Sequence, residues 1–119
     1  MKRCDGHQSY RCFEKYVISH SDVFYDGKKL DEASASSFKD LGYGYGKDSF
    51  DVYFCGKKIS GASANSFRLL KDGYAKDAFD VYFYGKKVSD ASASSFSVDE
   101  NGYAHDTFST YYFGKKIGD

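Results

Sequence analysis

Four residues near the N-terminus are of the types that bind zinc: Cys4, His7, Cys12 and His20. Zinc sites in proteins are built from Cys and His ligands that usually come in closely spaced pairs. Only the interval between Cys4 and His7 suits such a pair, and the remaining intervals match no zinc motif. The sequence therefore predicts no metal site here, with Cys12 in a core and the histidines on the surface.

Acidic residues recur as Asp-x-x-Asp pairs, Asp48 with Asp51 and Asp77 with Asp80. Calcium requires six or more oxygen ligands from a densely acidic loop, which these pairs do not supply. Asp is also common at the start of a tight turn, because its side chain accepts hydrogen bonds from the backbone that follows it. We interpret these residues as the first residues of turns.

The residues needed for nucleophilic catalysis are a Ser or Cys, a base and an orienting acid that meet in space. The serines of this chain lie in a repeated segment of small residues. His105 occupies the place that Lys47 and Lys76 hold elsewhere, which indicates a surface substitution. No Gly-rich loop precedes a helix, so no nucleotide site is indicated. We expect no catalytic residue, no cofactor and no enzymatic activity.

The Asp pairs, the serines of the small-residue segments and His105 belong to a unit that is repeated along the chain. Gly-Lys-Lys begins at Gly27, Gly56, Gly85 and Gly114, each 29 residues after the last. Three other markers keep the same interval: a Phe (Phe38, Phe67, Phe96), a Tyr (Tyr16, Tyr45, Tyr74, Tyr103) and an Asp (Asp48, Asp77, Asp106). The sequence predicts one repeat domain over 1–119, with units at about 9–30, 37–59, 66–88 and 95–117. The first unit diverges, as expected of a terminal unit with one neighbour.

Turn residues divide each unit into short strands. In the third unit the expected strands are 67–70, 74–76, 81–83 and 86–88. A two-residue turn at Tyr84 and Gly85 places Phe83 opposite Lys86, and Tyr82 opposite Lys87. The predicted fold class is all-β: four tandem antiparallel meanders of about 29 residues, in an open solenoid-like array or a small closed ring.

The small-residue segment between units has neither strand periodicity nor bulk. Ser92 is predicted to cap one helical turn there, with its side chain accepting a hydrogen bond from a following backbone N–H. Ser34 and Ser63 occupy the same place in their units.

Side chains alternate between the two faces of a strand. One face of the third unit carries Phe79, Val81, Phe83 and Val88, and we expect it to form the core. The other face is expected to be exposed and to form the candidate partner surface, whose residues are Asp51, Tyr53, Lys58, Asp80, Tyr82, Lys87, Tyr111 and Lys116. Tyr rings among charges on a regular surface suit the docking of a protein. The alternative is a solvated face with cross-strand Lys–Asp and Lys–Tyr pairs.

The overall composition bears on the class of partner and on the cellular location. Seventeen basic residues balance seventeen acidic ones, which gives no argument for nucleic acid or an acidic membrane. No apolar run is long enough to cross a bilayer. The first residues contain no secretory signal, and three Cys without regular spacing fit a reducing compartment. The sequence favours a cytoplasmic location, unless a leader has been removed.

The whole unit, GYAKDAFDVYFYGKKVSDASASSF, resembles the DKNYW repeat family of bacteria. The resemblance rests on Tyr-Ala-Lys-Asp (74–77), Val-Tyr-Phe (81–83), Gly-Lys-Lys (85–87) and the small-residue turn that ends at Phe96, and it covers about residues 9–119. Family members usually have Asn before the hairpin Gly and Asp-Pro in place of Ser92-Ala93, and the string that names the family is absent here. The resemblance implies tandem β-units of largely unassigned function and no catalytic residues.

We therefore expect a non-enzymatic repeat scaffold that binds another protein through the predicted Asp–Tyr–Lys face. Two alternatives remain open at this point. Repeats of different chains could stack into a filament, or exposed Tyr rings could stack on carbohydrate. A small-molecule ligand is not expected.

Overall fold

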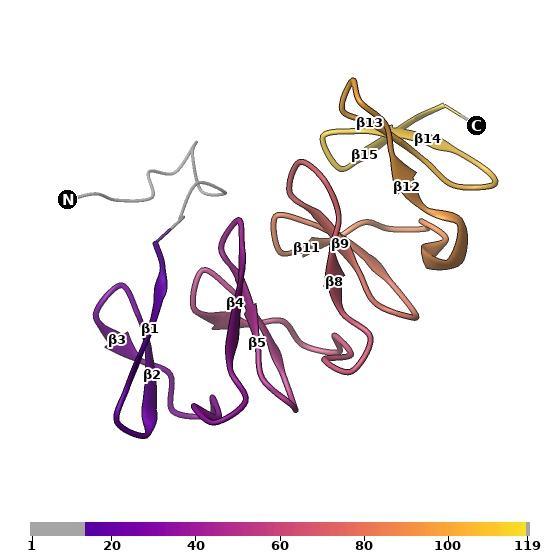
Figure 1. Ribbon diagram of the computed structural model, residues 1–119. Coiled ribbons are helices and arrows are strands. Elements are labelled where there is room, and N and C mark those ends of the chain that lie inside the picture. The colour runs from indigo at the N-terminus through magenta and orange to yellow at the C-terminus, as the bar shows by residue number, and fades with distance from the viewer. Residues whose placement is uncertain (1–13, 119) are drawn as a thin grey trace.

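The computed structural model describes residues 14–118, which form short antiparallel strands in four separate sheets (Figure 1). The first sheet contains β1 (Tyr16–Ser19), β2 (Asp22–Tyr25) and β3 (Lys28–Lys29). The second contains β4 (Lys39–Gly42), β5 (Tyr45–Lys47), β6 (Val52–Phe54) and β7 (Lys57–Lys58). The third contains β8 (Arg68–Leu69), β9 (Tyr74–Lys76), β10 (Val81–Phe83) and β11 (Lys86–Lys87). The fourth contains β12 (Ser97–Val98), β13 (Tyr103–His105), β14 (Thr110–Tyr112) and β15 (Lys115–Gly118).

Each sheet is a meander, because its strands pair in their order along the chain. The sheets follow one another in a curved open row, with β1–β3 at one end and β12–β15 at the other (Figure 1). The all-β prediction is confirmed, and of the two arrangements left open the row is the one observed. We call each sheet, with the loop that follows it, unit 1 to unit 4. No helix within residues 14–118 is long and apolar enough to cross a membrane.

The predicted hairpin register is confirmed, since Phe83 pairs with Lys86 and Tyr82 with Lys87. The turn between them has positive φ at both central residues, 44° at Tyr84 and 82° at Gly85. This is the geometry of a two-residue turn whose twist matches that of the strands. Tyr84 is a poor residue for positive φ, which costs about 1–2 kcal/mol. Its ring packs edge-on against Phe83 at a centroid distance of 4.7 Å, and this contact offsets part of that cost.

The small-residue segments (33–38, 62–67 and 91–96, here called connectors) join successive sheets. The third contains a single 3₁₀ turn, η2 (Ala93–Ser95), where a helical turn was predicted. The predicted cap is wrong, because the Ser92 side chain makes no capping hydrogen bond. The Ser92 N–H instead donates to Asp106 of unit 4 at 2.7 Å. The connectors at Ser34 and Ser63 are turns without a helix.

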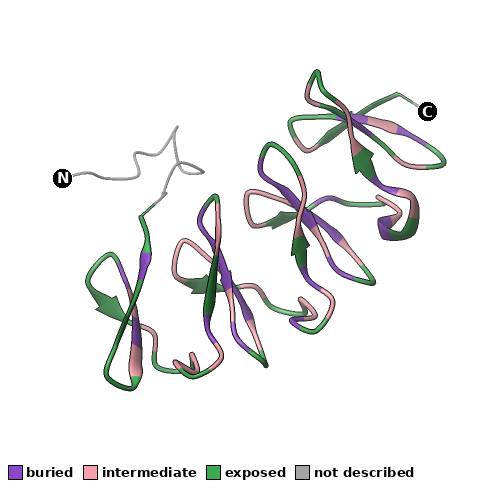
Figure 2. Cartoon of the chain, viewed as in Figure 1, coloured by how far each residue is buried: buried purple, intermediate pink, exposed green. Residues whose placement is uncertain are grey.

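The apolar core lies between units, not within them. The cluster between units 3 and 4 combines Tyr74, Val81 and Phe96 of one unit with Ala104 and Tyr111 of the next. Equivalent clusters lie between units 2 and 3 and between units 1 and 2. In Figure 2 the buried segments accordingly recur in each sheet and in the connectors between sheets. A single unit has no apolar core of its own, as is typical of repeat arrays.

The prediction that one face of each sheet forms the core and the other is exposed to solvent is wrong. Tyr53, Tyr82 and Tyr111 are only 3%, 2% and 0% exposed, because the preceding unit covers that face of each sheet. Val81 and Val88 are buried as expected, on the face toward the following unit. Phe79 is exposed, because it lies in the turn between β9 and β10, where strand alternation no longer applies.

Candidate functional site

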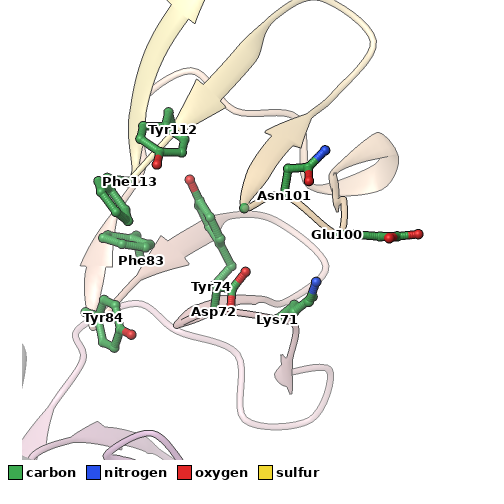
Figure 3. A pocket seen from close by; sticks show the side chains of 10 residues that line it. Lys71, Asp72, Tyr74, Phe83, Tyr84, Glu100, Asn101, Tyr112 and Phe113 are labelled. Carbon is green, nitrogen blue, oxygen red and sulfur yellow. The ribbon is translucent and has the colours of Figure 1, made fainter.

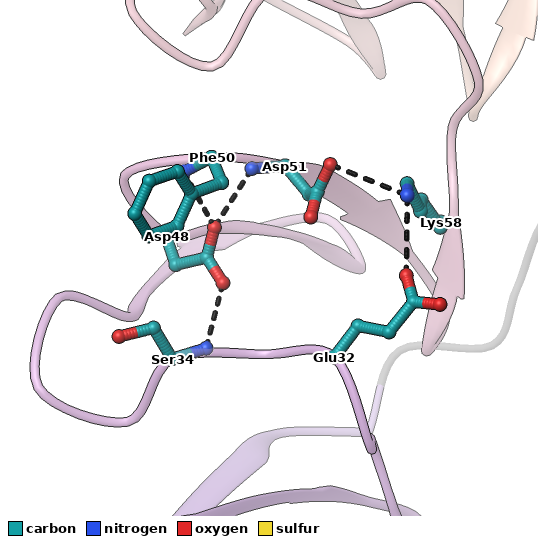
Figure 4. Close-up of polar contacts among 6 residues, drawn as sticks. All are labelled: Glu32, Ser34, Asp48, Phe50, Asp51 and Lys58. Carbon is teal, nitrogen blue, oxygen red and sulfur yellow. Dashed lines mark hydrogen bonds and ion pairs between the residues drawn. The ribbon is translucent and has the colours of Figure 1, made fainter.

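The predicted Asp–Tyr–Lys surface is not one exposed surface, because its Tyr residues are buried and its charged residues lie at the edges of the sheets. Tyr53 and Lys58 do share one face of a strand pair, but the ring is buried and only the charged ends reach the edge of the sheet. The Lys58 Nζ lies 3.5 Å from Asp51 and 3.1 Å from Glu32 of unit 1 (Figure 4). Lys87 and Asp80 form the same cross-strand pair at 3.4 Å. The predicted Lys–Asp pairs are confirmed, whereas a row of exposed tyrosines is absent from these positions.

The last unit carries the remaining members of that predicted surface, Tyr111 and Lys116. Tyr111 is buried, and its hydroxyl donates to Asp106 Oδ2 at 2.9 Å. Lys116 is exposed and pairs with Tyr111 across the strands β14 and β15.

Asp77 organises both a turn and the junction between two units. Its Oδ1 accepts hydrogen bonds from the N–H groups of Phe79 at 2.8 Å and Asp80 at 2.7 Å, which confirms its role at the start of a turn. Its Oδ2 accepts a third bond, from the N–H of Ser63 in the preceding connector, at 2.7 Å. The sequence did not indicate this third bond. Asp48 makes the same set with Phe50, Asp51 and Ser34 (Figure 4).

Asp106 repeats the arrangement in unit 4. Burial of its carboxylate acts to raise the pKa, but hydrogen bonds from the N–H groups of Ser92, Phe108 and Ser109 and from the Tyr111 hydroxyl outweigh burial. The pKa of Asp106 is therefore lowered, and the ionised form is the one that the fold holds.

No group of three or more His, Cys, Asp or Glu is placed to hold a metal within residues 14–118. Three of the four candidate zinc ligands, Cys4, His7 and Cys12, lie outside the described residues. His20 is exposed.

Lysines bind each connector from the sheet that precedes it, whereas the aspartates bind it from the sheet that follows. The Lys47 Nζ donates to the carbonyl of Ala64 at 2.9 Å and to that of Phe67 at 3.2 Å. Lys76 reaches Ala93 in the same way, at 2.8 Å. His105, at the equivalent position in unit 4, is exposed as predicted, and its Nε2 lies 3.3 Å from Asp99.

Tyr45 connects unit 2 to two turns of unit 3. Its hydroxyl donates to the Gly73 carbonyl at 3.0 Å and accepts a bond from the Gly85 N–H at 2.8 Å. Tyr16 makes both bonds one unit earlier, to Gly44 and from Gly56. Burial raises the pKa of Tyr45 well above its usual range, despite the opposing bond from Gly85.

Tyr53 is buried on the other side of the same sheet, toward unit 1, without such bonds. Its hydroxyl is the one buried side-chain polar atom with no hydrogen-bond partner among residues 14–118. Burial, together with the nearby Asp48 carboxylate, raises its pKa to about 12. Burial raises the pKa of Tyr82 to about 12 as well.

Tyr45 and Tyr53 give a matched test of the hydrogen bonds between units. Tyr45→Phe leaves the Gly85 N–H and the Gly73 carbonyl without the hydroxyl, and we expect it to lower the free energy of unfolding by about 2 kcal/mol. Tyr53→Phe removes only an unpartnered hydroxyl, and we expect no loss or a small gain, within about 0.5 kcal/mol. Urea titration of both variants measures the difference, and equal losses would refute the role assigned to the Tyr45 hydroxyl.

A hollow lies between units 3 and 4 (Figure 3). It has a volume of about 430 Å³, with Phe83, Tyr112 and Phe113 on one side and Lys71 and Glu100 on the other. The residues that line it include no Ser, Cys or His, so a Ser or Cys nucleophile with a His base beside it is not among them. Its aromatic side suits contact with an apolar group.

A second apolar feature recurs in every unit from 2 to 4. Phe50, Phe79 and Phe108 are 73%, 72% and 70% exposed, and we call them the phenylalanine row. Each occupies the same turn, and each backbone N–H donates to the Asp two residues earlier at 2.8–2.9 Å. Sequence reasoning placed Phe79 in the core. The signal that was available is the Asp two residues before it, since an Asp-initiated turn takes the next residues out of the strand.

Comparison with known proteins gives one match. A family model described as the DKNYY family matches residues 45–116, well over half of the chain. This finding confirms the repeat-family resemblance, with Tyr in place of Trp in the family's name. No curated protein and no solved structure matches the chain.

Proposed function

This chain belongs to the DKNYY family, and we propose that it is a non-enzymatic scaffold that binds another protein through the phenylalanine row. The observation that supports the proposal is the exposure of Phe50, Phe79 and Phe108 at one repeated position. A single exposed apolar side chain is ordinary on a protein surface. Large apolar residues that recur with the unit form a regular set of contacts, which one extended partner can bind together.

The backbone of each turn is already ordered before a partner binds. Two hydrogen bonds that the Asp77 carboxylate accepts, from the N–H groups of Phe79 at 2.8 Å and Asp80 at 2.7 Å, fix the turn that carries Phe79. Binding therefore orders little more than the ring itself, which limits the entropic cost of association. Aromatic anchors on a rigid support are typical of the residues that contribute most to protein interfaces.

The chemistry of the surface favours protein over other macromolecules. The formal net charge is zero, so the scaffold lacks the basic excess of a nucleic-acid surface. The preceding unit covers the rings of Tyr53, Tyr82 and Tyr111, which supports a protein partner over carbohydrate stacked on these rings.

The proposal is tested first by identifying the protein that contacts the phenylalanine row. A photo-crosslinking phenylalanine analogue at position 79, expressed in the native host, should link the chain covalently to one discrete protein. The same analogue at Lys86, which is exposed on the neighbouring hairpin, is the position control.

The purified partner is then titrated against two triple variants. We expect Phe50→Ser with Phe79→Ser and Phe108→Ser to weaken binding at least about a hundredfold, since each ring contributes of the order of 1 kcal/mol or more when it is buried. The matched control replaces the exposed Lys57, Lys86 and Lys115 by Ser at the same interval and should bind as the wild type does. Both triple variants should unfold near the wild-type temperature. Unchanged affinity in the phenylalanine variant would overturn the proposal.

A further inference from the structure

The outward face of the unit 4 sheet repeats the features by which the sheet of each earlier unit contacts the next one. Tyr74 is 1% exposed beneath unit 4, whereas Tyr103 at the same position in unit 4 is 40% exposed. Tyr112 occupies the place of Phe83, and its ring lies 4.7 Å from that of Tyr103. Ile117, at the place of the buried Val88, is exposed as well.

The outward face of unit 1 repeats the receiving half of the same interface. In units 2, 3 and 4 the hairpin glycine lies against a ring of the preceding unit. A Cβ added at Gly56, Gly85 or Gly114 would come within 2.8, 2.5 or 2.7 Å of Tyr25, Phe54 or Phe83. Gly27 has the same backbone, with φ of 79°, but such a Cβ would meet nothing within 4 Å.

The hydrogen-bonding groups at the two ends also correspond. The Gly56, Gly85 and Gly114 N–H groups each donate to the tyrosine hydroxyl of the preceding unit, at 3.1, 2.8 and 2.8 Å. The Gly27 N–H has no partner within residues 14–118. The Tyr103 hydroxyl likewise has no hydrogen-bond partner within the described part of the chain. Unit 4 thus carries a ring and a hydroxyl, and unit 1 carries the open glycine that fits both.

We propose that the outward face of unit 4 binds unit 1 of a second copy of this chain, head to tail. The Tyr112 ring lies over Gly27 of the second copy, as Phe83 lies over Gly114. The Tyr103 hydroxyl accepts the Gly27 N–H, as the Tyr74 hydroxyl accepts that of Gly114 at 2.8 Å. Exposed Val17 of the second copy extends the apolar contact on the receiving face.

A second copy is the occupant because the contact continues an interface that the chain already forms between its own units. An unrelated protein would have to present an equally open glycine to the Tyr112 ring and the Tyr103 hydroxyl. The contact uses different surfaces on the two copies, so it is heterologous and leaves one free end of each kind. Successive copies therefore extend the row of sheets.

The test is the molar mass in solution, measured by sedimentation velocity on the full chain. We expect the mass of the wild type to increase with protein concentration between about 1 µM and about 1 mM, which tests dissociation constants over the same range. Tyr112→Glu blocks the unit 4 face and Val17→Glu blocks the unit 1 face, so each variant alone should remain a monomer. Both residues are exposed, so folding is preserved, and near-ultraviolet circular dichroism checks it.

Mixing the two variants gives the sharpest outcome. The Tyr112→Glu chain keeps an intact unit 1 face, and the Val17→Glu chain keeps an intact unit 4 face. An equimolar mixture should therefore form a dimer and nothing larger. A wild type that stays monomeric at every concentration would overturn the proposal, as would continued growth of either single variant or a mixture that stays monomeric. If Tyr112→Glu fails to fold, Ile117→Glu blocks the same face and replaces it.

Discussion

Replacing Asp77 by Asn is expected to lower the free energy of unfolding by about 2–4 kcal/mol, although the two side chains have nearly the same shape. The Asp77 carboxylate is buried and accepts N–H bonds from Ser63, Phe79 and Asp80, with both oxygens in use. An amide has one oxygen, so its NH₂ must face at least one of these N–H donors. Whichever way the amide lies, a buried donor loses its partner.

The matched control is Asp80→Asn, the same change three residues later. Asp80 forms a solvent-accessible ion pair with the exposed Lys87 at 3.4 Å, and pairs at the surface contribute about 0–1 kcal/mol. Urea titrations of both variants, followed by tyrosine fluorescence, compare the two sites directly. Comparable losses at both positions would show that charge, and not the hydrogen bonds to the connector, sets the effect.

Gly85→Ala is the second change for which we expect a large loss. A Cβ at Gly85 would lie 2.5–2.8 Å from Cδ2, Cγ and Cβ of Phe54. Two of these atoms belong to the base of the side chain and cannot move unless the backbone of unit 2 moves. The variant must therefore move units 2 and 3 apart, which costs packing. The strain of an alanine at φ of 82° is a second cost. We expect a total loss of about 2–4 kcal/mol.

Gly27→Ala separates the two causes of this loss. Gly27 has φ of 79° in the same kind of turn, with nothing within 4 Å of an added Cβ. Its cost should be that of the backbone alone, about 1 kcal/mol. Both variants are measured at low protein concentration, where chains do not contact one another. If Gly85→Ala costs no more than Gly27→Ala, the ring of Phe54 does not hold unit 3 in place.

The sequence by itself determined the repeat, the strands and the hairpin register. These features depend on local chemistry: Gly73 and Gly85 allow positive φ, and the runs between them fix which residues face each other. Asp77 at the start of its turn follows from the same local logic, since two of its three hydrogen bonds go to residues within the turn.

Only the tertiary structure decided which faces of the strands are buried. A β-strand has two faces, and the alternation of residues sorts side chains between them without saying what covers each one. Here every inner sheet has a neighbour on both sides, so Val81 and Tyr82 are both buried although they point in opposite directions. The third bond of Asp77, to Ser63, was hidden for the same reason, because it joins residues of different units. Alternation along a strand is a property of the chain alone, whereas burial depends on the neighbouring unit, and the position of that neighbour is set by packing between units.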